Sequence, residues 1–167
     1  MENLEQSFWS VSIYVDKDEN LLGIPCGLSD KYGVADIDVV MRLKAPYSDR
    51  KLENYIESVI EKCYSKKHND ESDVSTIEKY TKIKGFVNAT KDFTLITVVK
   101  TKEEGYSIMP TFNDFERGPI VIDDDEVCLP EKYAVGQMAA AIRRMIAIYV
   151  KANAAAAAGA MFGDLKN

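Results

Sequence analysis

The stretch Glu126-Val127-Cys128-Leu129-Pro130-Glu131-Lys132-Tyr133, with the apolar-striped segment after it, repeats an earlier stretch, Val40-Met41-Arg42-Leu43-Lys44-Ala45-Pro46-Tyr47. An offset of 86 residues aligns the two copies. Similar side chains then coincide at Leu43 and Leu129, Tyr47 and Tyr133, Leu52 and Met138, Ile56 and Ile142, Val59 and Met145, and Ile60 and Ile146. Each copy combines β-forming residues, a turn with proline and tyrosine, and apolar residues at helical spacing. The repeat therefore predicts two similar strand–turn–helix units.

Two principal helices are expected from these units. The first should run from Ser48, a suitable N-cap residue with Asp49 in the first turn, to about Lys67. Its apolar stripe at helical spacing consists of Leu52, Tyr55, Ile56, Val59, Ile60 and Cys63. The second is expected over about Ala134 to Lys151, with the stripe Val135, Met138, Ala139, Ile142, Met145, Ile146 and Tyr149. We interpret Tyr47 and Tyr133 as hydrophobic staples against the first turn of each helix.

The rest of the chain alternates between short β-forming segments and polar turns. Strands are expected at 8–15, 21–25, 35–43, 83–89, 93–100 and 106–111, with a further hairpin formed by 120–122 and 126–129. The segment Val74–Tyr80 fits either a helical turn or the lead-in to a strand. These elements predict an α+β fold, with a mostly antiparallel sheet of about six or seven strands and two main helices packed on it.

The length and composition favour one domain. A chain of 167 residues with 46% apolar residues can bury a core of its own. We place this domain at residues 1–151. Residues 152–167 are rich in alanine, which favours helix, so this segment is either an extension of the last helix or a C-terminal tail.

The charge balance limits the classes of partner. The formal net charge is -6, which argues against direct nucleic-acid binding because phosphates would be repelled. An acidic surface suits a basic protein partner or simply provides solubility. The polar, acidic N-terminus lacks the pattern of a secretory signal, and no apolar run reaches the ~20 residues of a membrane span. With three widely spaced cysteines and no C-x-x-C pair, we expect reduced thiols, a cytoplasmic location and no membrane association.

The chain shows no recognisable catalytic or metal-binding motif. His68 is the single histidine, so the scattered cysteines lack the partners of a zinc site. A Cys63–His68 nucleophile pair competes with the position of Cys63 on an apolar helix stripe, which favours burial. Asp36 and Asp38 share one face of an expected strand, where an exposed sheet face explains them as well as acid–base chemistry does. We therefore expect no catalytic residue, no metal and no cofactor.

The sharpest charge feature is the acidic cluster Asp123, Asp124, Asp125 and Glu126. It lacks the alternating ligands and central glycine of a calcium loop. Two interpretations stay open, a solvated hairpin turn and a docking surface for lysines or arginines of a partner. As candidate partner-binding residues we take these four together with Asp114 and Glu116, which are nearby in the sequence.

Several of these segments resemble a known family. The succession of Tyr106–Thr111, an acidic loop, Gly118-Pro119, Val127–Pro130 and a helix opening with Gly136–Ile142 is similar to the C-terminal half of CdiI-type immunity proteins of bacterial contact-dependent growth inhibition systems. In that family a strand similar to I-K-P-T precedes a loop, and a helix begins near E-L-G-x-A-L-R. The first half resembles the family at Asp36-Ile37-Asp38, at Tyr47-Ser48-Asp49 and in the helix through Leu52. The resemblance covers most of residues 35–151.

The resemblance implies a cytoplasmic immunity protein without enzymatic activity. Such a protein binds the C-terminal toxin domain of a CdiA-type effector, often a nuclease, and blocks it. The acidic residues would meet a basic toxin surface, or a toxin segment would pair with a sheet edge at the hairpin near Asp18 or the one near Glu104. Two alternatives remain open. One is an adaptor protein with the same fold, and the other is a small hydrolase using Asp36, Asp38 or Cys26.

Overall fold

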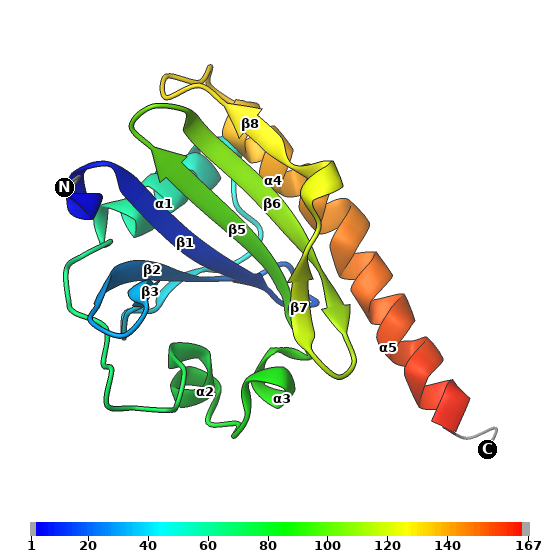
Figure 1. Ribbon diagram of the computed structural model, residues 1–167. Helices are drawn as coiled ribbons and strands as arrows, with labels where there is room; N and C mark the ends of the chain where they lie inside the picture. The colour runs from blue at the N-terminus through cyan, green and yellow to red at the C-terminus, as the bar shows by residue number, and fades with distance from the viewer. Residues whose placement is uncertain (1–2, 165–167) are drawn as a thin grey trace.

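The computed structural model describes residues 3–164 and contains a curled, antiparallel eight-stranded sheet with helices packed against it (Figure 1). The strands are β1 (Phe8–Val15), β2 (Leu21–Ser29), β3 (Gly33–Asp36), β4 (Met41–Leu43), β5 (Thr94–Thr101), β6 (Gly105–Asp114), β7 (Gly118–Val121) and β8 (Val127–Leu129). Their order is β3-β2-β1-β5-β6-β7, and β4 also pairs with β2 while β8 also pairs with β6. The predicted α+β fold with a mostly antiparallel sheet is confirmed.

The helices divide between two hydrophobic cores. They are α1 (Asp49–Glu61), α2 (Thr76–Thr81), α3 (Phe86–Thr90), α4 (Gln137–Met145) and α5 (Lys151–Asp164), and a π-helical segment, η3 (Ile146–Val150), joins α4 to α5. Helices α1 and α4 contact each other and bury their apolar stripes in the larger core. Helices α2 and α3 contribute Ile77 and Ala89 to a smaller core with Tyr14, Leu22 and Ile24. The two helices of the sequence repeat therefore share one core, as expected for similar units.

The repeat extends well beyond the strand–turn–helix units that the sequence revealed. β1 and β5 begin and end 86 residues apart, and they pair with each other antiparallel. Phe8 pairs with Thr101 and Val15 pairs with Thr94, so exchanging each residue for its counterpart reproduces the same register. This is the pattern of a local two-fold axis between β1 and β5. The sheet is thus made of two related halves that meet at its centre.

Each half ends in an edge strand that is interrupted. In the first half, β3 and β4 both pair with β2 and are separated by residues 37–40. In the second half, β7 and β8 both pair with β6 and are separated by residues 122–126. The predicted hairpin between 120–122 and 126–129 is therefore wrong, because these strands pair with β6 and not with each other. The hairpin was expected because strands that follow one another in sequence usually pair with each other. Here β6 is long enough to pair with β7 along one part and with β8 along another.

Contacts between α1 and α4 tie the two halves together. Glu57 of α1 accepts a hydrogen bond from the Tyr133 hydroxyl at 2.8 Å. Its counterpart in α4, Arg143, lies over the Tyr47 ring at 5.2 Å and donates to the Tyr47 carbonyl at 2.6 Å. Each helix therefore holds the tyrosine of the other half, so these tyrosines do more than staple their own helix.

A buried carboxylate caps the start of α4. Glu53 of α1 is 8% exposed and accepts hydrogen bonds from Gly136 N at 3.0 Å and Ala139 N at 3.0 Å. The first N–H groups of a helix need acceptors, and negative charge is favoured there. The N-cap residue of α4 is Gly136, which has no side chain to act as an acceptor. Glu53 therefore replaces a local cap by a contact between halves.

Some element boundaries differ from the sequence-based expectations. Residues 83–89 were predicted as a strand, but α3 occupies 86–90 because Thr90 Oγ1 donates to Phe86 O and Ala89 packs into the smaller core. Helix α1 ends at Glu61 and not near Lys67, because Tyr64 N leaves the helix to donate to Cys26 O at 2.8 Å. Tertiary contacts override local propensity in both places.

The segment 35–43 was predicted as one strand but is divided. Ile37 N donates to Pro25 O, and Val39 N then bonds back to Ile37 O at 2.8 Å, which turns the chain away from β2. Val74–Tyr80, which fitted either a helical turn or a strand lead-in, is mostly helical as α2. In the Ala-rich tail, residues 152–164 continue the helix as α5, and residues 165–167 lie outside the described residues.

Candidate functional site

The acidic cluster lies in the interruption between β7 and β8. Ile122 N makes a last hydrogen bond to Pro110 O at 3.0 Å before the chain leaves β6. Asp123–Asp125 then forms a short 3-10 helix, η2, closed by Glu126 N donating to Asp123 O at 3.1 Å. All four acidic residues are exposed. The cluster therefore lies in an interruption of an edge strand, where pairing with β6 stops and the side chains face solvent.

Two of the four acids are used by the fold and two are not. Tyr149 donates its hydroxyl to Asp125, and Ser107 donates its hydroxyl to Glu126. The Asp125 carboxylate raises the pKa of the Tyr149 hydroxyl. Among residues 3–164, Asp123 and Asp124 have no hydrogen bond or ion pair through their carboxylates. These two carboxylates are therefore available to a partner.

The first half shows how a carboxylate at the position equivalent to Asp124 is bound within the fold. Asp38 lies in the interruption between β3 and β4, 86 residues before Asp124. Its carboxylate accepts hydrogen bonds from Lys79 Nζ at 2.9 Å and from Thr76 Oγ1 at 3.0 Å. Burial opposes ionisation of Asp38, but these two hydrogen bonds and the charges of Lys79 and Lys66 together lower its pKa. Helix α2 thus covers in the first half what the second half leaves open.

A small hollow lies beside the free acids. Asp124, Asp125, Glu126 and Val127 form one wall, and α4 and η3 form the other through Arg144, Met145, Ile148 and Tyr149. Its volume is about 180 Å³, below the roughly 300 Å³ at which small-molecule sites begin. The hollow therefore has room for one side chain of a partner and not for a substrate of ordinary size.

Asp114 and Glu116 do not join this cluster. They lie at the tip of the β6–β7 hairpin, at the opposite end of β7 from η2 (Figure 1). Asp114 accepts hydrogen bonds from Glu116 N at 2.9 Å and Arg117 N at 2.8 Å, and these main-chain donors lower its pKa. Asp114 is therefore a turn-forming residue, whereas the Glu116 side chain is exposed.

Exposed apolar side chains lie along the hairpin between the two acidic sites. Phe112 and Ile120 are cross-strand partners and so share a face, and they are 39% and 38% exposed. Phe115 at the tip is 77% exposed. Sequence reasoning missed this feature because a strand pattern does not say which apolar residues stay uncovered. We call Phe112, Phe115, Glu116, Ile120, Asp123 and Asp124 together the β7 surface.

The strand edges are not where the sequence placed them. The turns near Asp18 and Glu104 join β1 to β2 and β5 to β6, and each of these strands has a partner on both sides over part of its length. The outer strands are β3 and β7 with β4 and β8. β7 contains Pro119, which has no N–H to offer an added strand. Strand addition is therefore disfavoured at Pro119, and a contact with β7 would have to be made by side chains.

The residues considered for catalysis come together only in part, because Cys26 and Asp36 are cross-strand partners in β2 and β3 while Asp38 lies apart from them. Asp36 faces Ser12, whose hydroxyl lies 3.5 Å from it, while Asp38 faces Thr76 and Lys79. The His68 ring contacts the Asp36 carbonyl at 2.5 Å, with its second nitrogen toward Asp70. Across residues 3–164, no group of three or more His, Cys, Asp or Glu side chains is placed to hold a metal ion.

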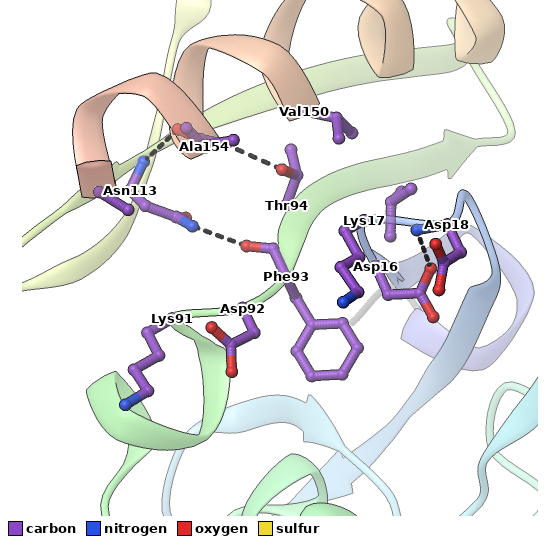
Figure 2. A pocket seen from close by; sticks show the side chains of 13 residues that line it. Asp16, Lys17, Asp18, Lys91, Asp92, Phe93, Thr94, Asn113, Val150 and Ala154 are labelled. Atoms are coloured by element: carbon purple, nitrogen blue, oxygen red, sulfur yellow. Dashed lines mark hydrogen bonds between the residues drawn. The ribbon is translucent and has the colours of Figure 1, made fainter. Parts of the chain in front are cut away.

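A second hollow, of about 410 Å³, lies between the β1–β2 turn, the start of β5 and helix α5 (Figure 2). Asn153 of α5 forms its inner wall, accepting from Asn113 N at 2.9 Å and donating to Thr94 Oγ1 at 3.1 Å. Lys17, Asp18, Lys91 and Asp92 surround the opening. Asn153 is buried. In the sequence, the only indication of this contact is that a polar residue stands within a run of alanines. The hydrogen bonds of Asn153 hold α5 against the sheet beside this hollow, whose rim carries both acidic and basic side chains.

Comparisons with known proteins give a relation of fold alone. No protein-family model matches the chain, and no curated protein matches it. Among solved structures, it is similar to a protein described as "Protein of Unknown Function NMB0488 from Neisseria meningitidis". The TM-score is 0.62 at 11% sequence identity, and the match covers 88% of this chain and 98% of that one. Within the described residues, no helix is both long and apolar enough to cross a bilayer.

Proposed function

We propose that this chain is an immunity protein that binds the C-terminal toxin domain of a CdiA-type effector and neutralises it. The β7 surface makes the contact and covers the active or substrate-binding surface of the toxin. The observation that carries this proposal is the pair of free carboxylates, Asp123 and Asp124, beside exposed apolar side chains on an edge strand. In this role the protein acts in the cytoplasm of the cell that it protects and needs no chemistry of its own.

The charge of the chain supports this choice of partner. Nuclease domains present basic surfaces to their nucleic-acid substrates, and a protein of net charge -6 is attracted to such a surface. Complementary charge speeds the encounter and fixes orientation. A stable complex also needs a buried interface of roughly 1,600 Å² with a few anchors that lose all contact with water. The apolar part of the β7 surface supplies such anchors.

The first half of the molecule supports a specific contact. Lys79 binds Asp38 in the covered interruption, at the position that corresponds to Asp124. A lysine or arginine of the toxin would bind Asp124 in the same way, with its stem in the hollow against Met145 and Ile148. The partner would thus do for the second half what α2 does for the first.

The experiment that tests the proposal is co-purification with the toxin domain encoded next to this gene. The two proteins are expressed together, and the complex is measured by size exclusion at low and high salt. We expect a one-to-one complex, protection of cells that express the toxin, and slower association at high salt. A matched control is Glu71→Lys with Asp73→Lys, two exposed acids in the loop between α1 and α2, which should bind normally.

Each outcome selects between functions. A complex with protection establishes the immunity role. A stable complex with a protein that is not a toxin would instead identify an adaptor, the alternative that the same fold permits. Turnover of a substrate that is lost on changing Asp36, Asp38 or Cys26 would overturn both and restore the hydrolase hypothesis.

A further inference from the structure

Two buried cysteines from distant parts of the sequence share one contact in the first half. Cys26 of β2 is 2% exposed, and Cys63, just beyond α1, is 9% exposed. Ser10 N donates to Cys26 Sγ at 3.3 Å, and the Cys63 thiol contacts Ser10 O at 3.6 Å. Both sulfurs therefore lie against the main chain of one residue of β1.

The main chains of the two cysteines also lie side by side. Tyr64 N, in the residue that directly succeeds Cys63, donates to Cys26 O at 2.8 Å. A disulfide requires Cα atoms about 4.4–6.8 Å apart, with the side chains directed toward each other. A main-chain hydrogen bond at this position brings the backbones close to that range, and the shared contact with Ser10 directs both sulfurs to one place.

The two thiols are not equivalent. The neighbouring Cys63 side chain is the main reason that the pKa of Cys26 is lowered to about 7, although burial opposes the shift. The same contact, together with burial, raises the pKa of Cys63. Cys26 is therefore the more acidic of the two thiols and forms the thiolate that reacts with oxidants more readily, while Cys63 is the neighbouring thiol that can resolve the product.

We propose that Cys26 and Cys63 are a peroxide-oxidisable pair that closes into an intramolecular disulfide between β2 and the end of α1. The Cys26 thiolate attacks one oxygen of hydrogen peroxide, the O–O bond breaks, and after proton transfer Cys26 sulfenic acid and one water are formed. The Cys63 sulfur then attacks the Cys26 sulfur, the S–O bond breaks, and a second water leaves with the thiol proton. Two thiols lose two electrons in total, and one peroxide is reduced to two waters.

This inference does not depend on the proposed function, since the pair lies in the first half and the β7 surface lies in the second. The disulfide would constrain the unfolded chain by joining residues 37 positions apart. For a loop of that length we expect a rise in melting temperature of about 10 °C. The modification would thus couple the oxidation state of the surroundings to the lifetime of the folded protein.

The test uses the full chain with Cys128→Ser, because Cys128 is exposed and would form disulfides between molecules. The folded protein is treated with hydrogen peroxide, and its intact mass, free thiols and melting temperature are measured. We expect a mass loss of about 2 Da, loss of both remaining thiols and a peptide linked through Cys26 and Cys63. Reduction with dithiothreitol should restore the starting mass and melting temperature.

Two results would overturn the proposal. One is that both thiols survive in the folded protein at peroxide concentrations that oxidise unfolded chains. The other is that Cys26 gains oxygen without a crosslink. A second variant, Cys63→Ser with Cys128→Ser, keeps a polar donor beside Cys26 and should stop at Cys26 sulfenic acid, which dimedone traps. Because the crosslink is measured with both cysteines present, the test does not depend on how well this second variant folds.

Discussion

The two interrupted edge strands have the same position in their halves but opposite surroundings. Residues 37–40 lie under α2, where the Thr76 hydroxyl is 3.0 Å from both Ile37 O and the Asp38 carboxylate and Lys79 binds Asp38. Residues 122–126 have no such cover, and Asp123 and Asp124 face solvent. The difference comes from the segment that succeeds each repeat helix. After α1 the chain returns across the sheet as α2 and α3, while after α4 it continues as η3 and α5.

This comparison shows how a repeated framework leaves one interruption open and not two. An interrupted edge strand exposes carboxylates in either half. In the first half an inserted segment satisfies them, and that site becomes structural. In the second half Asp123 and Asp124 remain free, and the neighbouring apolar side chains stay partly exposed. The site is thus defined by the missing cover as much as by the residues present.

The largest effect is expected from breaking the link between the halves at Glu53. Glu53→Ala leaves the part-buried Gly136 N–H and the buried Ala139 N–H without an acceptor, and we expect it to destabilise the fold by about 3 kcal/mol. Glu53→Gln keeps an acceptor and should lose about 1 kcal/mol. Urea unfolding measures both. Equal stability of Glu53→Ala and wild type would mean that α4 does not need this cap.

The next effect concerns a carboxyl that only the first half has. Asp36 corresponds to Ile122 in the second half. Burial raises the pKa of Asp36 to about 6, and the Ser12 hydrogen bond and the charge of His68 only partly oppose this. The folded state therefore holds a proton that the unfolded chain releases near pH 4. Stability from this group is complete below pH 4 and falls as the pH rises to 6, by about 2 kcal/mol.

Asp36→Asn tests this pH dependence, because the amide does not titrate. Unfolding free energies of wild type and variant are compared from pH 4 to pH 8. Tyr14 and His68 are also close to Asp36, so the difference between the two proteins, and not the pH dependence of wild type alone, reports on Asp36. The difference between the two proteins should grow in favour of the variant as the pH rises. A difference that stays constant across this range would show that Asp36 ionises as it does in water.

A third prediction concerns the open interruption itself. Asp123→Lys with Asp124→Lys should slow toxin association at low salt by about tenfold or more, because both carboxylates are free. The free energy of unfolding should change by less than about 0.5 kcal/mol. Stopped-flow association and urea unfolding measure the two quantities, with Glu71→Lys and Asp73→Lys as the charge-matched control. Unchanged association would remove the acidic part of the β7 surface from the interface.

The smallest effect is expected in the covered interruption. Lys79→Ala removes the ion pair with Asp38. The two side chains are 37% and 43% exposed, so the free energy of unfolding should fall by at most about 0.5 kcal/mol. Thr76→Val removes a buried hydroxyl and should lose about 1 kcal/mol. Denaturant midpoints separate the two. The reverse order would mean that charge, and not the hydroxyl, fixes α2 over residues 37–40.

Much of the framework could be predicted because it depends on local patterns. Apolar spacing located α1 and α4, and the 86-residue offset linked β4 to β8 through Leu43 and Leu129. The sharing of β6 by β7 and β8 could not be predicted, since no local pattern tells a strand which of two neighbours it will join. The contact of Glu53 with Gly136 spans 83 residues and has no signature in the sequence either.

The candidate site was predicted only in part, for a related reason. The acidic run marked Asp123 and Asp124 as exposed, but the contacts that occupy Asp125 and Glu126 come from Tyr149 and Ser107. Proximity in sequence grouped Asp114 with this run, although β7 separates them. An aspartate a few residues before a Gly-Pro step is a typical turn-forming residue, and that signal could have identified its role.

The pairing of β1 with β5 has a consequence for how the molecule could be divided. The two halves are connected through the exposed residues Lys91 and Asp92, and they meet along a ladder of main-chain hydrogen bonds and a shared core. A chain opened at that connection would be two subunits of a heterodimer. Its stability would then depend on concentration, as mass action requires of any complex. The single chain is in this sense a dimer whose effective concentration is set by a loop.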